Sequence, residues 1–499
     1  DFAFVSWTIN AGRWGHLSGV PRFMPFTMNA LFDCPMQEWW MDETNRGGSV
    51  TTAAFGARLI RASVRERPSV CNPYDFTHWE DLWQAGYGSS MPLTERKFRF
   101  CLAITNGSMP ATLLGAPYAP GQSKELAQTF TTRQPWLVRA KSVKWCALVV
   151  SDDTRNFYGG GSAIGNYVEH CFGAFRALSE AHVPFDLITD QDLEENRLSD
   201  YKVVILANTA CLSDRAAKNI RDFVAGGGGV VATVESSRYD ENGQPRPDFA
   251  LADIFGARFK QMALEIPTTG LPDAPKPVSE AGAWDSAGSA KGAIYPAASA
   301  PAEIVDAKLK EFAATGWGFV GKCAAVTPAD EKSVCATINI REAYDKPTPP
   351  GAAKGQMPAM ILSKPGAGRV VYFPAGIDQG YWAYPYPYQR MLLVNAVRWA
   401  AGSAPSIRVQ APMLVAATFY TQEDKRGRRT IVHLLNETNS TAGHASPTGC
   451  DTPTREEIVP VHDVKVTFTG ARPKRVHLEP EGKDLRVDKV VDGWMVTLP

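Results

Sequence analysis

The stretch KWCALVVSDDTRNFYGGG, residues 144–161, decides the fold, because an unbroken apolar run leads into a polar, glycine-rich exit. Residues 166–183, NYVEHCFGAFRALSEAHV, follow with apolar side chains at helical spacing. Three more strand patterns contain DLIT, VVIL and VVAT, at 186–189, 203–206 and 230–233, and a polar helix precedes the last of them. Such apolar runs are typical of parallel strands that are covered on both faces. The alternation of strands and helices predicts a doubly wound, parallel α/β sheet.

Length and composition limit the possible classes of protein. A chain of 499 residues exceeds one hydrophobic core, so we expect several domains. The 52 basic residues balance the 52 acidic ones, which favours neither a nucleic acid nor a membrane as partner. The nine cysteines include no C-x-x-C pair, so we expect no metal and no cofactor. The first residue is Asp1, which indicates a processed chain or part of a longer one, and we favour a secreted or periplasmic location.

Residues 1–143 also alternate between strand and helix patterns, with acids and aromatic residues after the strands. We expect the C-terminal part of a (β/α)₈ barrel, in which catalytic groups lie at the C-terminal ends of the strands. An intact barrel takes about 250 residues, so the opening strands are expected to be missing from this segment. The pattern TERKFRFCLAITNGSMPATLL, residues 94–114, predicts a helix that runs into another strand. For the strand order of the barrel we nevertheless count FCLAITNG, residues 100–107, as the last strand and SVCNPYDF, residues 69–76, as the one before it.

The remainder of the chain divides into two further predicted domains. Residues 144–402 contain the doubly wound unit, interrupted at about 263–355 by a segment rich in Pro, Gly, Ala and Ser. We interpret this segment as a loop-rich insertion with little regular structure. Residues 403–499 alternate with a period of about two, which predicts a small antiparallel β-sandwich.

The first candidate site is the acidic, aromatic segment after residue 37. Together with Asp33 just before it, Glu38, Asp42 and Glu43 could supply one or both of the carboxyl groups that a glycosidase needs. Trp39 and Trp40 could form a flat platform for a sugar ring. The alternative is a solvated loop whose acids cap a helix and whose tryptophans pack between domains.

The second candidate site follows the strand pattern SVCNPY. Asp75 and His78 could bind a sugar hydroxyl or assist proton transfer, and Trp79 could stack on the sugar. A turn or a helix N-cap is an equally reasonable interpretation of the same residues.

Two other patterns point to different chemistry. The loop YGGGSAIG, residues 158–165, resembles a dinucleotide fingerprint, but its glycine spacing is wrong. Cys211 follows a strand, as a nucleophile could, yet a class I amidotransferase carries its cysteine on a glycine-flanked elbow after the next strand. Glu235 and Ser236 occupy that position here. We therefore expect an amidotransferase-like topology without amidotransferase chemistry.

Several stretches of the doubly wound unit resemble the β-galactosidase trimerisation domain. They are ALVVSDDTRNFYG, AHVPFDLITDQDL, YKVVILANTACLSD, VAGGGGVVATVESSRYDENG and DFALADIFGARF. REEIVPVHDVKV and the strand-rich tail after it look like the C-terminal domain of related glycoside hydrolases. The resemblance covers residues 140–262 and 356–499, and over 1–140 it is limited to the order and spacing of elements.

The resemblance implies a glycoside hydrolase of the family-42 β-galactosidase-like type, with a catalytically silent amidotransferase-like domain after the barrel. It implies a retaining mechanism on β-linked glycosides such as β-galactosides. In such barrels the fourth strand carries the acid/base and the seventh carries the nucleophile. This chain offers no match for the fourth strand, and its seventh carries Asp75 in place of the usual Glu. Glu38, Asp42 and Glu43 then lie near the sixth.

Two hypotheses follow. The first is a glycoside hydrolase-like protein with Glu38, Asp42, Glu43 and Asp75 as catalytic candidates. The second is a non-catalytic oligomeric scaffold or carbohydrate-binding protein with a degenerate barrel. The first predicts a carbohydrate substrate, and the second predicts sugar binding, or none, without hydrolysis. Both also predict a homo-oligomer, which the resemblance implies to be a trimer, or a second chain that completes the barrel, because exposed sheet edges and apolar helix faces are costly.

Overall fold

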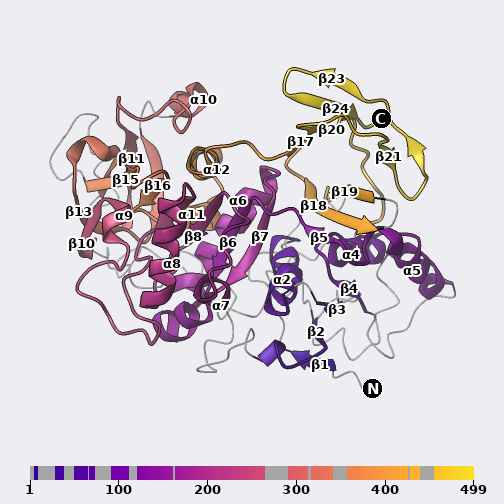
Figure 1. The fold of residues 1–499 in the computed structure, drawn as a ribbon, viewed down its shortest axis with the longest axis horizontal. Helices are drawn as coiled ribbons and strands as arrows, with labels where there is room; N and C mark the ends of the chain where they lie inside the picture. The colour runs from indigo at the N-terminus through magenta and orange to yellow at the C-terminus, as the bar shows by residue number, and fades with distance from the viewer. Residues whose placement is uncertain are drawn as a thin grey trace, which may run out of the picture.

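The computed structural model shows a mixed α/β protein with several sheets (Figure 1). The structure describes residues 5–8, 28–38, 50–65, 67–72, 92–111, 121–160, 163–263, 290–312, 316–340, 357–424, 427–438 and 455–499. The following paragraphs concern these residues alone.

The N-terminal part contains a four-stranded parallel sheet. Its strands lie side by side in chain order. They are β1 (Val5–Thr8), β2 (Cys34–Glu38), β3 (Val70–Asn72) and β4 (Met109–Pro110), accompanied by helices α2 (Val50–Ser63), α4 (Leu93–Thr105) and α5 (Gln122–Thr131). The prediction that residues 100–107 form a strand is wrong, since Phe100 to Thr105 belong to α4 and the last strand is the short β4.

A nine-stranded sheet forms the centre of the molecule. Five neighbouring strands are parallel, in the order β16-β9-β8-β6-β7. These strands are β6 (Cys146–Val150), β7 (Phe185–Thr189), β8 (Val203–Leu206), β9 (Gly229–Thr233) and β16 (Arg369–Phe373). This arrangement confirms the parallel sheet that the apolar runs predict.

Four antiparallel strands extend the central sheet beyond β16. They are β15 (Met357–Ser363), β14 (Val334–Ile340), β11 (Ala290–Pro296) and β12 (Trp317–Gly321), paired in that order. A further strand, β13 (Ala324–Pro328), pairs with β10 (Ala257–Met262) outside the sheet. The prediction that residues 263–355 have little regular structure is therefore wrong for 290–340. That segment supplies four strands and the short helix α10 (Ala307–Glu311).

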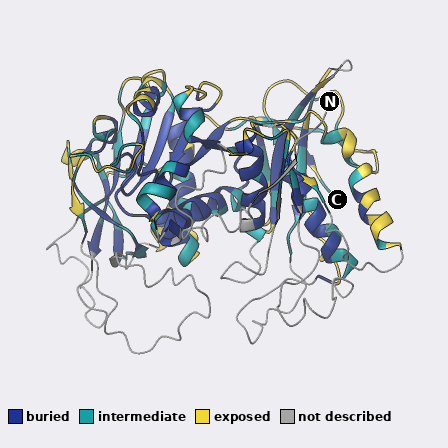
Figure 2. Cartoon of the chain, turned by 90° about the horizontal axis from the view of Figure 1, so that it is seen from below, coloured by how far each residue is buried: buried dark blue, intermediate teal, exposed yellow. Residues whose placement is uncertain are grey.

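Helices cover both faces of the central sheet, and each parallel strand contributes alternate side chains to two hydrophobic cores. Along β6, Cys146, Leu148 and Val150 belong to the core under α2, α6 (Glu169–Glu180), α11 (Ile377–Ala383) and α12 (Pro387–Ala401). Ala147 and Val149 belong to the opposite core, under α8 (Asp214–Ala225) and α9 (Ala252–Phe255). All five side chains are fully buried, as the dark strands of Figure 2 show. Both faces of the strand are apolar because neither meets water.

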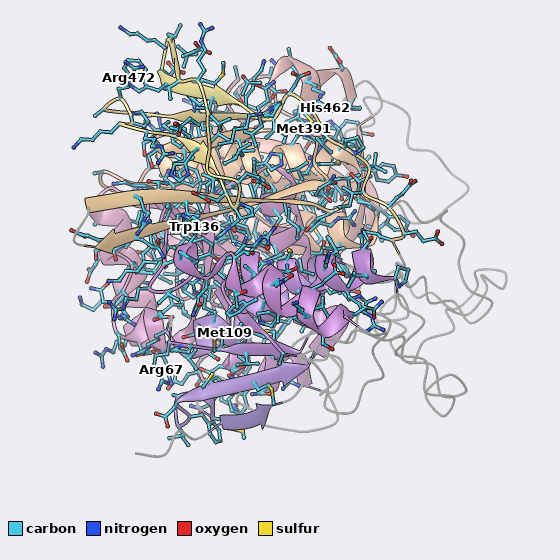
Figure 3. All side chains as sticks on the ribbon, turned by 90° about the vertical axis from the view of Figure 1, so that its right-hand side faces the viewer. Arg67, Met109, Trp136, Met391, His462 and Arg472 are labelled. Atoms are coloured by element: carbon cyan, nitrogen blue, oxygen red, sulfur yellow. The ribbon has the colours of Figure 1, made fainter. Side chains whose placement is uncertain are left out.

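The C-terminal part consists of antiparallel strands, as the period of two predicts. One sheet has the order β17-β20-β24-β23, and a second has the order β19-β18-β5. A small core with Ile407, Phe419 and Val466 joins strands of both sheets. Figure 3 shows this part, which carries Arg472, on the far side of the N-terminal helices from Met109. The strands are β5 (Lys141–Ser142), β17 (Ile407–Gln410), β18 (Val415–Asp424), β19 (Gly427–Asn436), β20 (Lys465–Phe468), β23 (Asp488–Val490) and β24 (Gly493–Thr497), with β21 (His477–Leu478) and β22 (Lys483–Asp484) paired beside them.

A buried ionic network joins α4 to the C-terminal part. The Glu95 carboxylate accepts hydrogen bonds from Arg99 Nε at 2.9 Å and from Arg455 Nη1 at 2.7 Å. All three residues are at most 3% exposed. The Arg455 guanidinium also lies 3.8 Å from the centroid of the Phe98 ring. Two segments separated by 360 residues in sequence therefore share one desolvated carboxylate.

Replacing this carboxylate should be costly. We expect Glu95→Gln to lower the free energy of unfolding by about 3–5 kcal/mol, because two buried guanidinium groups lose their counter-charge. Glu125→Gln is the matched control, since Glu125 on α5 forms an exposed ion pair with Lys97 on α4, the helix that carries Glu95. It should change stability by about 0.5 kcal/mol or less. Urea unfolding followed by circular dichroism tests this, and equal effects of the two substitutions would contradict it.

A second constraint lies where α6 crosses α11. A Cβ atom on Gly173 would lie 1.9 Å from the backbone oxygen of Asp378, so the helices can approach this closely only with glycine here. We expect Gly173→Ala to cost at least about 1–3 kcal/mol, because the crossing is overpacked. At Gly226, the residue after α8, an added Cβ would meet its nearest atom at 3.4 Å. Gly226→Ala should leave the thermal midpoint nearly unchanged, and a comparable loss in both variants would refute the argument.

Candidate functional site

The carboxyl edge of the N-terminal sheet is the first candidate site. Glu38 is the last residue of β2, and its backbone pairs with that of Asn72, the last residue of β3. Because the strands are parallel, the segments after β2 and β3 leave the sheet at the same edge. The sequence candidates Trp39, Trp40, Asp42 and Glu43 follow β2, and Asp75, His78 and Trp79 follow β3. Apart from the backbone of Glu38, these candidates lie outside the described residues.

The carboxyl edge of the central sheet carries a different set of polar residues. Glu235 follows β9 and is 4% exposed. Its carboxylate accepts hydrogen bonds from the phenols of Tyr158 and, at 3.2 Å, Tyr239. Lys322 Nζ donates to the Tyr158 hydroxyl at 3.0 Å. Burial, followed by the charge of Glu235, raises the pKa of Tyr158 well above its ordinary value. This edge therefore holds a buried carboxylate that is satisfied by neutral phenols.

A second buried group at this edge consists of Thr233, Asp378 and His170. The Asp378 carboxylate accepts from Thr233 Oγ1 at 2.8 Å, and its other oxygen lies 2.8 Å from His170 Nδ1. A nucleophile–base–acid triad requires the imidazole between the hydroxyl and the carboxylate. Here the carboxylate lies between the other two, so the arrangement is not that of a triad.

Cys211, the candidate nucleophile of the amidotransferase alternative, is 1% exposed. Burial raises the pKa of its thiol far above the ordinary value. A buried, protonated thiol is inert as a nucleophile. The left-handed residue directly after β9 is Val234, with a φ of 49°, and not Glu235 or Ser236 as the sequence suggested, so the elbow position carries a side chain without nucleophilic chemistry. Among the described residues, no group of three His, Cys, Asp or Glu side chains could hold a metal ion.

Two neighbouring carboxyl groups at the same edge have raised pKa values. Burial, together with the charge of Asp153, raises the pKa of Asp190 to about 8. Burial, together with the charges of Glu241 and Glu194, raises the pKa of Asp153 to about 6. The backbone amide of Asp152 donates to Asp190 Oδ2 at 2.8 Å. This hydrogen bond favours the ionised form, but burial and the charge of Asp153 outweigh it, so the fold favours a proton on Asp190 at neutral pH.

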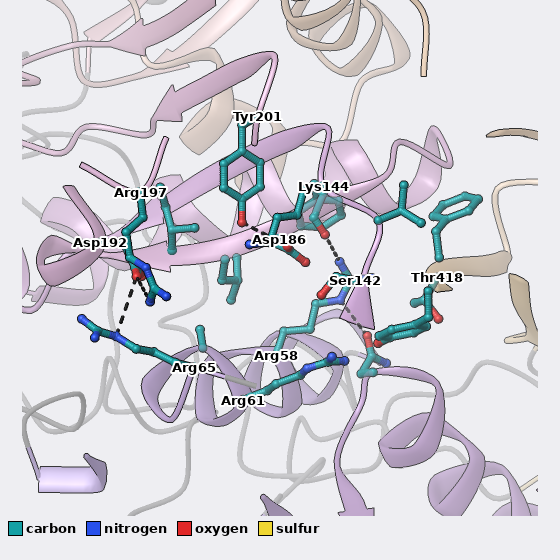
Figure 4. Close-up of a pocket in the computed structure, with 18 of the residues that line it drawn as sticks. Arg58, Arg61, Arg65, Ser142, Lys144, Asp186, Asp192, Arg197, Tyr201 and Thr418 are labelled. Carbon is teal, nitrogen blue, oxygen red and sulfur yellow. Dashed lines mark hydrogen bonds and ion pairs between the residues drawn. The ribbon is translucent and has the colours of Figure 1, made fainter. Parts of the chain in front are cut away.

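Between α2, β7 and β18 lies a pocket of about 120 Å³ (Figure 4). Arg58 and Arg61 of α2, and Arg65 two residues beyond the end of that helix, line it. Arg58 Nε donates to Asn106 Oδ1 at 2.9 Å, and Arg58 Nη1 donates to the backbone oxygen of Phe185 at 3.0 Å. Burial lowers the pKa of Arg58. The other charged residues of the pocket are Lys144, Asp186, Asp192 and Arg197.

Sequence reasoning did not single out this pocket. Arg58 and Arg61, three positions apart, lie on one face of α2, and that spacing is the signal that the sequence contains. Charged residues on one face of a helix are usually solvated, so only the packing of α2 against β7 and β18 distinguishes this face.

No helix in the described ranges is long and apolar enough to cross a bilayer.

The protonation of Asp190 predicts a pH-dependent stability. An unfolded aspartate ionises near pH 3.9, whereas the folded protein keeps the proton up to about pH 8. Its contribution is thus fully present at low pH and is lost as the pH rises to about 8. We expect the stability of Asp190→Asn relative to the unsubstituted protein to increase steadily from pH 5 to pH 8. Urea midpoints measured at each pH test this, with the exposed Asp222→Asn as control. A difference independent of pH would contradict it.

Comparisons with known proteins agree with this architecture. A family profile described as ThuA, trehalose utilisation, matches residues 165–400. Among solved structures, the chain is similar to α-L-fucosidase isoenzyme 2 from Paenibacillus thiaminolyticus, at 17% identity and a TM-score of 0.64, over 91% of this chain and 62% of that one. No curated protein matches the chain.

Two β-galactosidases are similar as well. The enzyme from Bacillus circulans sp. alkalophilus has 14% identity and a TM-score of 0.63, over 100% of this chain and 63% of that one. A catalytic mutant of a GH42 β-galactosidase from G. stearothermophilus has 12% identity and a TM-score of 0.58, over 95% and 60%. The chain thus spans about three fifths of the length of these structures. At these identities the likeness concerns the fold, which is a mixed α/β fold of the kind found in glycoside hydrolases.

Proposed function

We propose that the protein is a glycoside hydrolase-like protein that hydrolyses β-linked glycosides, such as β-galactosides, by a two-carboxylate retaining mechanism. The single observation that carries the proposal is the likeness to glycoside hydrolase folds over 91–100% of the chain. It is supported by the position of Glu38 at the carboxyl end of β2, the edge at which parallel barrels carry their catalytic groups.

The geometry of neighbouring strands suits this chemistry. A retaining glycosidase needs two carboxyl groups about 5–5.5 Å apart, one as nucleophile and one as acid and then base. Neighbouring strands lie about 4.8 Å apart. Glu38 ends β2, and Asp75 follows the end of β3 by three residues. A pair drawn from Glu38 or Glu43 on one side and Asp42 or Asp75 on the other is our proposed catalytic pair.

The aromatic residues beside these acids complete the proposed site. Trp39 and Trp40 directly follow Glu38, and Trp79 follows Asp75 by four positions. Indole rings stack on the apolar faces of sugars, and His78 could bind a hydroxyl group. For the whole protein we propose a homo-oligomer, with a trimer as the first possibility, or a second chain that completes the barrel.

Carbohydrate binding without hydrolysis is the second candidate function, and one observation favours it. Near-parallel tyrosine rings form a row at the surface between α11 and α12. The ring centroids of Tyr386 and Tyr388 lie 5.4 Å apart at 8°, and those of Tyr384 and Tyr386 lie 6.5 Å apart at 23°. Atoms in contact lie about 3.5–4 Å apart, so these rings are offset and leave part of each face uncovered. Tyr384 and Tyr386 are 44% and 53% exposed.

The catalytic proposal is tested by four substitutions assayed on a panel of aryl β-glycosides: Glu38→Gln, Asp42→Asn, Glu43→Gln and Asp75→Asn. We expect two of the four to lower kcat by about 10²–10⁴-fold or more, because proton transfer or the covalent intermediate is lost. Glu311→Gln, an exposed acid on α10, serves as control and should be unaffected.

Azide distinguishes the two roles. In the alanine variant of the nucleophile it should yield a glycosyl azide of inverted configuration, and in that of the acid/base one of retained configuration. Unchanged turnover in all four amide variants would refute the assignment. If the protein shows no turnover but binds oligosaccharides, and Tyr386→Ala abolishes that binding, the second candidate function is supported instead.

A further inference from the structure

The arginine pocket of α2 is unrelated to the proposed sugar site. Its volume of about 120 Å³ is well below the roughly 300–1,000 Å³ of pockets that enclose drug-sized ligands. It is nevertheless far larger than the voids of packed interiors, which seldom exceed one water molecule. The pocket therefore suits a small ion or a single charged group, and it is too small for a disaccharide.

The chemistry of the wall favours a negative charge. Arg58 and Arg61 occupy one face of α2, where like charges three positions apart repel each other, and Arg65 follows the end of the helix. The hydrogen bonds of Arg58 to Asn106 and Phe185 go to neutral oxygens, and Arg61 Nη2 donates to the backbone oxygen of Ala140 at 3.1 Å. Guanidinium groups match the oxygens of phosphate and carboxylate in pairs.

The acids around the pocket engage mainly its outer cations. Arg65 pairs with Glu195 at 2.6 Å, and Lys144 pairs with Asp200 at 3.2 Å. Arg197 lies 3.5 Å from Asp192, which is also 3.9 Å from Arg65. Asp186 accepts a hydrogen bond from the Tyr201 hydroxyl at 3.1 Å. The guanidinium groups of Arg58 and Arg61 face the interior of the pocket beside the Asp186 carboxylate, and the charges of Asp186 and Glu437 both act on Arg58 (Figure 4).

The pocket also lies where three parts of the chain meet. α2 belongs to the N-terminal part, Phe185 to Ile188 belong to the central sheet, and Thr418 to Tyr420 belong to β18 of the C-terminal part. The Arg61 guanidinium stacks 4.8 Å from the centroid of the Tyr420 ring. A ligand here would contact all three parts at once, and ligand sites are common at such junctions.

We propose that this pocket binds a phosphate-type oxyanion, held chiefly by Arg58 and Arg61, and that the bound ion ties the three parts of the chain together. The oxyanion is either a free ion or the phosphate group of a small phosphorylated sugar, whose remainder would extend out of the pocket. The proposal is independent of glycoside hydrolysis, because it concerns different residues and requires no turnover.

Isothermal titration calorimetry of the full chain with inorganic phosphate, at ionic strength held constant with potassium chloride, tests the proposal. We expect saturable binding of one ion per chain. Arg58→Gln and Arg61→Gln should each weaken it about ten- to a hundredfold, because a charge-assisted hydrogen bond is lost. Arg221→Gln, which alters an exposed ion pair between Arg221 on α8 and Asp253 on α9, should leave binding unchanged. Glucose 6-phosphate in a parallel titration distinguishes the sources, since tighter binding than phosphate identifies a phosphorylated sugar and weaker binding a free ion.

A substitution of opposite sign keeps the test decisive where an arginine variant fails to fold. Asp186→Asn keeps an acceptor for the Tyr201 hydroxyl but removes the negative charge that faces the pocket. It should therefore bind phosphate several-fold more tightly. The proposal is overturned if phosphate gives no saturable heat, if Arg221→Gln weakens binding as much as Arg58→Gln does, or if Asp186→Asn weakens binding. Because binding is measured directly, a failure here is distinct from an absence of glycosidase activity.

Discussion

The desolvated carboxylate of Glu95 is the constraint on which the arrangement of the chain's two ends depends. It neutralises Arg99 of its own helix and Arg455 from the C-terminal part, all three out of contact with water. A buried charge without a partner is far more costly than the pair itself is favourable. Arg455 of the C-terminal part therefore has its counter-charge only when it packs against α4, whereas Glu95 also pairs with Arg99 of its own helix. The hydroxyls of Thr418 and Tyr420, which both donate to the backbone oxygen of Thr105, reinforce the same junction.

The predictability of each element from sequence follows from where its side chains lie. The strand VVIL at 203–206 is apolar throughout because both of its faces are buried, so the parallel core of the sheet is legible in the sequence. The strand WGFVG at 317–321 alternates between buried and exposed residues and contains two glycines. In a segment rich in Pro, Gly and Ala such a strand resembles a loop. Only its pairing with β11 gives it regular structure.

The helix α4 was mistaken for a strand for a related reason. Phe98, Phe100, Leu102 and Ile104 alternate along the chain, which is the period of a half-buried strand. In the structure these residues and Arg99 between them are buried together, because Arg99 and Arg455 share the buried carboxylate of Glu95. Tertiary ion pairing thus overrides the pattern. The sequence did not mark the pocket arginines as site residues for a similar reason, since charged residues on a helix predict a solvent-exposed face unless the surroundings of the helix are known.

The two carboxyl edges differ in what their acids can do. At the central sheet, two phenols donate to Glu235, and a hydroxyl and an imidazole contact Asp378. Asp190 accepts a hydrogen bond from the backbone amide of Asp152, and burial raises its pKa. A carboxylate that is buried and already satisfied cannot approach a sugar. A catalytic acid must instead face an open cleft at a strand end. The buried acids of the central sheet do not meet that condition, and this sheet serves instead as the support against which α2 packs.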